Sequence, residues 1–124
     1  MRERTGGCLC GAVRYAVRGE PTHVGCCHCA DCRKRSGSAF AIYAHWPRDA
    51  VDLDGELAEY DGDRFCATCG SRLGSIEDDA VEINLGTLDD PPFDLVPQAE
   101  LWIKRREPWL HPVEGASQYR ENRR

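Results

Sequence analysis

Apolar and polar residues alternate along several short segments of the chain, and this alternation indicates β-structure. Val13, Tyr15 and Val17 alternate with polar or small neighbours in residues 10–18, as expected for a strand with one buried face. Residues 80–88 repeat the pattern. No segment has the apolar spacing of a long amphipathic helix. The pattern therefore predicts a mainly β domain built from several short antiparallel strands.

Turn residues divide the rest of the sequence into further elements. The Asp54-Gly55 pair predicts a hairpin between residues 51–53 and 57–60. Asp78-Asp79 separates residues 72–77 from the 80–88 segment, and this predicts a second hairpin. The remaining elements are strands at 23–27, 39–46 and 101–104, and a helical turn at 30–36 that ends at Gly37.

The length and charge of the chain narrow the class of protein. Its 124 residues favour a single domain, with a core over about residues 6–109 and a polar tail over 114–124 that is expected to fray. Trp109 is expected to pack back on the sheet. The net charge of −5 argues against a general nucleic-acid binder, which is normally basic.

Targeting signals are absent from the pattern. No apolar run is long enough to span a membrane, and the first residues lack the apolar segment of a signal peptide. We therefore expect a cytoplasmic protein whose thiols stay reduced. The sequence leaves open whether the chain forms a homodimer.

All eight cysteines fall into three clusters, and this spacing indicates metal binding. The clusters are Cys8 with Cys10, Cys26 with Cys27, Cys29 and Cys32, and Cys66 with Cys69. Zinc is the first candidate for thiols packed this closely in a reducing compartment. Disulfide bonds are the alternative, but adjacent or nearly adjacent cysteines suit the ligands of one ion better than bridges between distant strands.

The Cys66-x-x-Cys69-Gly70 segment has the pattern of a zinc knuckle, in which two sulfurs point into one concavity. A closed structural site needs four ligands, and Cys8 and Cys10 form the other isolated pair. The spacing therefore predicts a structural zinc that ties the N-terminal strand to the middle of the chain. Buried, reduced cysteines without a metal are the alternative for either pair.

The central cluster contains a compact three-thiolate set, Cys27, Cys29 and Cys32. Neighbouring residues of an extended strand point to opposite faces, so Cys26 is expected to turn away if Cys27 faces the ion. Three protein ligands leave a fourth position for water or substrate, which marks a catalytic zinc. His28 is either a fourth ligand or, the favoured interpretation, an exposed or hydrogen-bonded side chain.

Three cations, Arg33, Lys34 and Arg35, follow the last of these cysteines directly. Adjacent cations would offset the negative charge of a three-thiolate zinc centre, and they would hold the carboxylates of an acidic substrate. The alternative is an ordinary solvated face.

Three motifs in this order and spacing resemble the glutathione-dependent formaldehyde-activating enzyme family, also called the GFA or centromere-protein-V family. The motifs lie in residues 7–15, in residues 27–34 together with 36–40, and in residues 65–71. The resemblance extends over about residues 6–109, which is nearly the whole chain.

This resemblance implies a β-tent fold of small antiparallel sheets stapled by two zinc ions. It implies that one set of cysteines holds a structural zinc and another a catalytic zinc open to a thiol; the sets are Cys8, Cys10, Cys66 and Cys69, and Cys27, Cys29 and Cys32. The activity that it implies is condensation of formaldehyde with glutathione to S-hydroxymethylglutathione, a carbon–sulfur lyase reaction in reverse.

Two functions from different classes fit these features. The first is a zinc-dependent enzyme that adds a small thiol to a small aldehyde or releases it, with His28, Asp31 and His45 as the candidates for proton transfer. The second is a non-catalytic, zinc-stapled module that binds a protein partner, its central cluster closed by Cys26 or His28. The number of protein ligands at the second zinc distinguishes the two.

Overall fold

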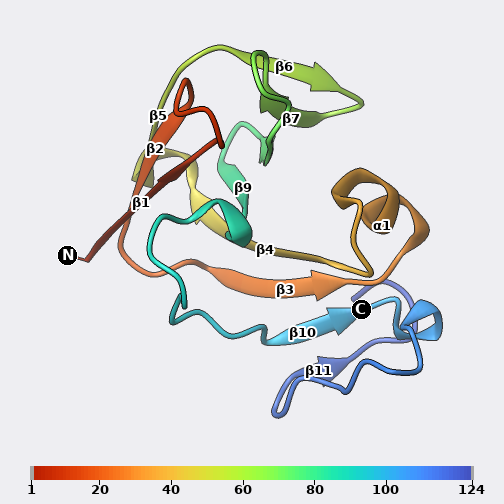
Figure 1. Cartoon of the computed structure of the whole chain (residues 1–124). Helices are drawn as coiled ribbons and strands as arrows, with labels where there is room; N and C mark the ends of the chain where they lie inside the picture. The colour runs from red at the N-terminus through yellow and green to blue at the C-terminus, as the bar shows by residue number, and fades with distance from the viewer. Residues whose placement is uncertain (1, 124) are drawn as a thin grey trace.

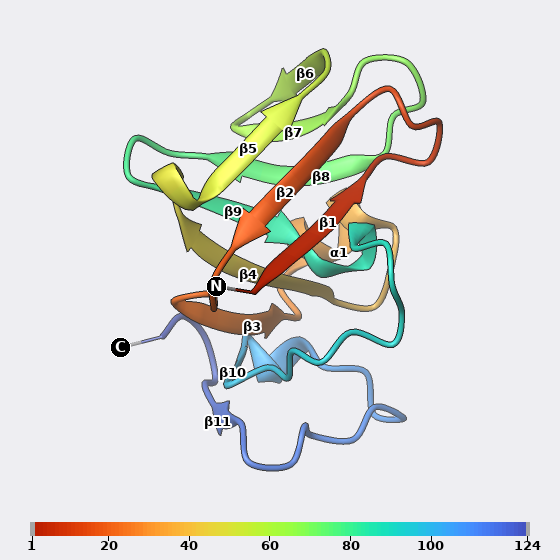
Figure 2. The same ribbon diagram turned by 90° about the vertical axis from the view of Figure 1, so that its left-hand side faces the viewer.

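The computed structural model describes residues 2–123 as two β-sheets and one short α-helix (Figures 1 and 2). The helix is α1 (Ala30–Ser36). The strands are β1 (Glu3–Gly7), β2 (Arg14–Arg18), β3 (His23–Cys27), β4 (Ala41–Pro47), β5 (Val51–Asp54), β6 (Leu57–Tyr60), β7 (Asp63–Cys66), β8 (Arg72–Ile76), β9 (Ala80–Asn84), β10 (Ala99–Leu101) and β11 (Ser117–Gln118). Short 3-10 turns are formed by Arg48–Ala50, Leu85–Thr87 and Ile103–Arg105. The prediction of a mainly β fold with small antiparallel sheets is confirmed.

The smaller sheet has the strand order β1-β2-β5, and the larger has the order β11-β10-β3-β4-β9-β8-β7-β6. Neighbouring strands are antiparallel except around β10, which runs parallel to both β3 and β11. In Figure 2 the small sheet lies across the middle of the large one. The core therefore forms between the two sheets.

The alternating residues of β2, with Val13 just before it, supply one side of this core. Val13 and Val17 are fully buried, and Tyr15 is nearly so. On the large sheet Trp46 is fully buried, and its indole Nε1 donates a hydrogen bond to the Gly19 carbonyl at 3.1 Å. The predicted alternation is confirmed, although β2 begins only at Arg14 because residues 9–13 form a turn.

The predicted hairpin at Asp54-Gly55 is wrong. The strands exist, but β5 pairs with β2 in the small sheet, whereas β6 pairs with β7 in the large one. Gly55 has φ +116°, and a side chain there would bring a Cβ within 2.4 Å of the Ala12 carbonyl oxygen. The turn signal therefore marks the crossing from one sheet to the other.

Other local predictions agree with the structure. The β8–β9 hairpin and β3 form where the pattern indicated, although β9 ends at Asn84 and a 3-10 turn follows. The apolar strand predicted over residues 39–46 is observed as β4, which begins at Ala41 and extends to Pro47. The helix ends at Gly37, whose left-handed backbone lets its N–H bond the Arg33 carbonyl.

The C-terminal region differs from its prediction. The last main strand is β10, which ends at Leu101, because Trp102 adopts a left-handed backbone that turns the chain. Trp109 is 68% exposed and does not pack on the sheet. The tail does not fray: β11 pairs with the free edge of β10, and the carbonyls of Tyr119 and Glu121 accept further backbone bonds.

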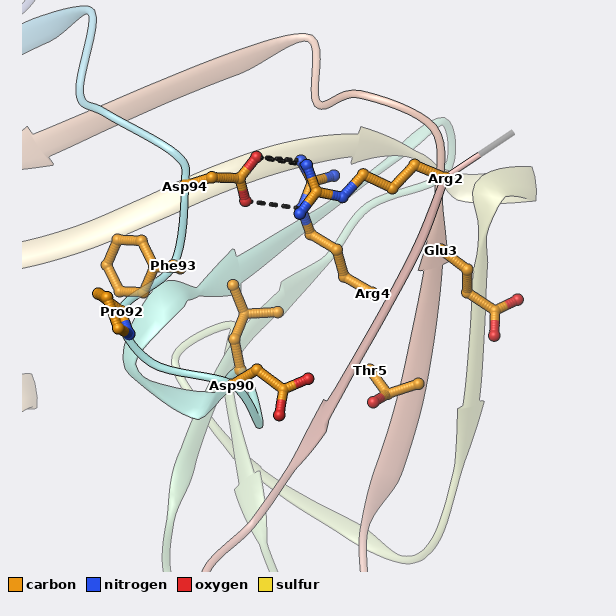
Figure 3. A pocket seen from close by; sticks show the side chains of 9 residues that line it. Arg2, Glu3, Arg4, Thr5, Asp90, Pro92, Phe93 and Asp94 are labelled. Carbon is orange, nitrogen blue, oxygen red and sulfur yellow. Dashed lines mark hydrogen bonds and ion pairs between the residues drawn. The ribbon is translucent and has the colours of Figure 1, made fainter.

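Figure 3 shows a hollow between β1 and the loop at residues 88–94. Arg4 is buried, and it bonds to Asp94 at 3.0 Å and to Glu20 at 3.2 Å. Arg2 also meets Asp94, at 2.7 Å. These charged side chains are paired with one another, and no cysteine lines the hollow. We therefore interpret the ion pairs as a clasp that holds the loop to β1.

Within residues 2–123, none of the helices has the length and apolarity that a bilayer crossing requires.

Candidate metal centres and active site

Two turns bring four cysteines together at one end of the molecule. The β1–β2 turn carries Cys8 and Cys10, and the end of β7 with the turn after it carries Cys66 and Cys69; the two turns lie side by side in Figure 2. All four sulfurs lie within 4.8 Å of one another. The Sγ atoms of Cys8 and Cys10 are 3.6 Å apart, and those of Cys10 and Cys66 are 3.7 Å apart. A tetrahedral zinc with bonds of about 2.3 Å separates its sulfurs by roughly 3.8 Å, so the donor set fits this ion.

Backbone N–H groups point at these sulfurs. Val13 N–H donates to Cys8 Sγ at 3.2 Å, and the N–H groups of Thr68 and Cys69 donate to Cys66 Sγ at 3.3 and 3.4 Å. Such bonds stabilise thiolate charge. The turns are also joined through Ser71, whose Oγ accepts the Leu9 N–H at 3.0 Å.

The thiols of this cluster differ in how readily they ionise. The Ser71 hydroxyl and backbone N–H lower the pKa of Cys69 to about 5. The Ala12 N–H favours ionisation of Cys10, but the hydrogen bond with Cys8, burial and the other thiols raise the pKa of Cys10 to about 11. Four sulfurs at this separation become thiolates together only if a cation offsets their charge.

The second cluster forms where β3 runs into α1. Cys27 ends β3, Cys29 is the N-cap of α1, and Cys32 lies in its first turn. Their three sulfurs lie within 4.8 Å of one another, and Cys29 Sγ accepts the Cys32 N–H at 3.3 Å. The hydrogen bond with Cys27, followed by burial, raises the pKa of Cys32. No further cysteine, histidine or carboxylate of residues 2–123 belongs to this group.

Cys26 and His28 face away from this trio. Cys26 is buried with Glu100, its register partner on β10. His28 Nε2 bonds to Glu100 Oε1 at 2.9 Å, and both side chains are only 2% exposed. Of the interpretations for His28, the hydrogen-bonded one agrees with the structure, in a buried setting.

Glu100 is the centre of a polar network that sequence reasoning missed. Its Oε2 accepts bonds from the Val113 N–H at 2.6 Å and from Gln118 Nε2 at 2.9 Å, and Arg106 lies 3.4 Å from Oε1. Burial alone would raise the pKa of Glu100, but these bonds, the one from His28 and the Arg106 charge lower it to about 2. The sequence feature that could have indicated this network is an acidic residue within an otherwise apolar segment.

The atoms of Cys26, His28 and Glu100 are close enough to suggest a third metal centre, since they lie within 4.8 Å of one another. However, the carboxylate already has its hydrogen-bond partners, and a guanidinium stands beside it. We therefore interpret this trio as a structural network that ties the C-terminal segment to the cysteine loop.

Only part of the positive charge that follows Cys32 is free to bind a substrate. Arg33 pairs with Glu107 at 2.5 Å, and Arg35 pairs with Asp61 at 3.3 Å. Lys34 is exposed and has no ion pair among the described residues. It lines a shallow hollow with Arg33 and Arg105, so positive charge does gather beside the three-sulfur cluster.

The proton-transfer candidates are scattered. His28 is bound to Glu100, and His45 bonds to Glu82 at 3.1 Å. Asp31 is exposed on α1.

Sequence reasoning assigned no role to Arg72 and Asn84, which lie on predicted strands but line a hollow beside α1 together with Ser36 and Ser38.

Comparison with known proteins identifies a family and a similar fold. Residues 3–105 match the sequence profile of a family described as glutathione-dependent formaldehyde-activating enzyme. No curated protein matches the chain. A crystal structure of a Rhodobacter sphaeroides protein is similar, with a TM-score of 0.53 and 24% identity over 70% of this chain and 91% of that one, which supports the fold alone.

The match to the family profile extends over most of the 124 residues and includes all three cysteine clusters. The chain therefore belongs to the glutathione-dependent formaldehyde-activating enzyme family.

Proposed function

We propose that the protein is a zinc-dependent, carbon–sulfur lyase-like enzyme that adds a small thiol such as glutathione to a small aldehyde such as formaldehyde, or releases it. The observation that carries this proposal is the unequal size of the two cysteine clusters, four sulfurs in one and three in the other. A four-sulfur set closes a structural zinc, whereas a three-sulfur set leaves one position for a substrate.

In this proposal Cys8, Cys10, Cys66 and Cys69 hold a structural zinc, and Cys27, Cys29 and Cys32 hold a catalytic one. The hydrogen bonding of His28 to Glu100 and the position of Cys26 beside the same carboxylate support an open fourth position. Both side chains that would have closed the second site belong to another network. This favours the enzyme over the non-catalytic module.

When bound, zinc would supply Lewis-acid chemistry that lowers the pKa of a thiol substrate. The reaction is an addition: the substrate sulfur bonds to the aldehyde carbon, the carbonyl π electrons move to oxygen, and one proton passes from the thiol to that oxygen. Nothing is oxidised and no group leaves. The chain's own contribution is to hold three sulfurs in one concavity and to attract anionic thiols through Lys34 and its neighbours.

The test measures, by exchange NMR at equilibrium, how fast glutathione and its formaldehyde adduct interconvert. Because the reaction also proceeds without an enzyme, the rate with protein is compared with the uncatalysed rate. The protein should accelerate exchange above the uncatalysed rate. Cys27→Ala should remove the acceleration, and Cys26→Ala, a change at the adjacent residue, should retain it. No acceleration by the wild type, or equal loss in both variants, would contradict the proposal.

A further inference from the structure

Tyr43 is a buried tyrosine whose hydroxyl has no partner in the protein but remains open to solvent. The side chain is only 8% exposed. Its hydroxyl makes no hydrogen bond within residues 2–123, yet it is not one of the unpaired polar atoms of that range that are closed to solvent. Buried tyrosines usually find a partner for their O–H. A fixed donor of this kind is available to a molecule from solution.

The packing around Tyr43 fixes the direction of its phenol. The ring stacks on that of His45, with centroids 5.4 Å apart, and the ring of His23 lies 6.4 Å away. His45 is itself held by Glu82 at 3.1 Å. A Cβ at Gly25 would stand only 2.9 Å from the Tyr43 hydroxyl oxygen. The hydroxyl therefore lies directly over Gly25 of β3, where the missing side chain leaves room for it.

This position is next to the three-sulfur cluster on the face of the large sheet. Gly25 pairs with Tyr43 across the β3–β4 ladder, and Cys27 pairs with Ala41. Residues two apart on a strand point to the same face and are roughly 7 Å apart. The Tyr43 hydroxyl and the Cys27 side chain therefore occupy neighbouring positions on one face, so one small substrate can meet both.

The proposed reaction needs a hydrogen-bond donor at such a position. Negative charge develops on the aldehyde oxygen as the sulfur bonds to carbon, and a fixed donor stabilises that charge. Among the candidates from the sequence, His28 and His45 each bond to a glutamate, and Asp31 is exposed. Burial raises the pKa of Tyr43, so its phenol keeps the proton that a donor requires.

We propose that Tyr43 is a catalytic residue that donates a hydrogen bond to the aldehyde oxygen while the sulfur–carbon bond forms. The inference rests on the proposed function. The sulfur supplies the electron pair of the new bond, and the carbonyl π pair moves to oxygen. The thiol proton passes to solvent, a solvent proton completes the new hydroxyl, and the phenol keeps its own proton. In the reverse direction the same hydrogen bond stabilises the adduct oxygen as it loses its proton.

Tyr43→Phe tests this role, because it keeps the ring and removes only the hydroxyl. Exchange between glutathione and its formaldehyde adduct at saturating concentrations should slow roughly a hundredfold, as for loss of one oxyanion donor. The zinc content and the melting temperature should match those of the wild type, since the hydroxyl has no partner in the protein. Tyr60→Phe is the matched control at an exposed tyrosine of β6 and should keep the wild-type rate. An unchanged rate in Tyr43→Phe, or a loss of zinc or of stability, would overturn the assignment.

NMR separates this inference from the proposed function. In protein isotopically labelled at the tyrosine Cζ carbon, the Tyr43 signal is the one that Tyr43→Phe lacks. The glutathione–formaldehyde adduct should shift this signal, whereas S-methylglutathione, which has no oxygen on the added carbon, should leave it in place. No shift with the adduct, or equal shifts with both compounds, would contradict the role of Tyr43. A shift with the adduct but no accelerated exchange would count against the proposed function and leave Tyr43 as the contact of the adduct oxygen.

Discussion

Cys26 and Cys27 are adjacent in the chain but face opposite sides of β3. Cys27 joins Cys29 and Cys32, whereas Cys26 lies beside Glu100. Strand alternation alone predicts this separation, and for that reason the three-sulfur group could be derived from the sequence. At the residue scale, the proposed distinction between a structural and a catalytic zinc site depends on the face of the strand to which each side chain points.

The two cysteine clusters should respond differently to loss of one sulfur. Cys69→Ser should unfold or precipitate the protein, because the four-sulfur site joins distant turns and a structural zinc contributes on the order of 10 kcal/mol to folding. Cys32→Ser should keep its fold and bind one zinc fewer. Circular dichroism melting with elemental analysis checks both variants. Equal loss of stability in the two would argue against a structural and a catalytic site.

Lys34 should assist an anionic thiol more than a neutral one. Lys34→Gln should raise KM for an acidic thiol about two- to fivefold at low salt, because an exposed charge acts weakly and is screened. KM for a neutral thiol should stay unchanged. Arg35→Gln is the matched control, since Arg35 is already paired with Asp61. The same KM change for both thiols would reduce the three cations to a solvated face.

At the scale of elements, the C-terminal segment supports the cysteine loop. Glu100 on β10 bonds to His28, which lies between Cys27 and Cys29, while β11 covers the other edge of β10. His28 N–H also donates to the Leu101 carbonyl at 3.0 Å. The position of the second cluster therefore depends on residues about seventy positions later in the chain.

Removal of the Glu100 carboxylate should loosen this support. Glu100→Leu leaves Arg106 and His28 without their partner, and loss of one member of a buried charged network costs about 3–5 kcal/mol. Urea unfolding of the zinc-loaded protein measures the loss, and hydrogen exchange should show lower protection of β10 and β11. Glu82→Gln, at a partly exposed pair, should change stability by less than about 1 kcal/mol. If Glu100→Leu left the free energy of unfolding nearly unchanged, the Glu100 network would not stabilise the C-terminal segment.

Local patterns predicted most elements but not all of their partners. The alternation in β2 and the turn before β9 depend on neighbouring residues, and both were predicted. The pairing of β5 with β2, rather than with β6, depends on which sheet buries each strand, and a turn signal does not encode that. The edge strand β11 was missed because its stability comes from β10, not from its own polar sequence.

The same limit applies to the site. Spacing within a few residues predicted the three-cysteine group and each pair of the four-cysteine group, and the need for four ligands joined the two pairs. The structure brings the members of each group together. Asn84, Arg72 and Glu100 reach their surroundings through sheet register, so their neighbours lie far away in sequence. In a single sequence these residues cannot be distinguished from ordinary strand residues.

At the scale of the whole molecule, the four-cysteine cluster connects the small sheet to the large one. Its members come from the β1–β2 turn on one sheet and from β7 and its following turn on the other. The Arg4–Asp94 clasp joins β1 to the loop after β9 elsewhere in the fold (Figure 3). Under the proposed division, one metal ion therefore holds the sheets together while the other remains available for chemistry.

The most direct test of this account is the response of the cobalt-substituted protein to a thiol. Cobalt in both sites reports sulfur ligands through its charge-transfer band, and three protein sulfurs leave one exchangeable position. Added glutathione should strengthen that band in the wild type and have no effect in a variant that has lost the Cys27, Cys29 and Cys32 site. A spectrum that already shows two four-sulfur sites, or sulfur with histidine, and does not respond to thiol would contradict the account and favour a zinc-stapled interaction module.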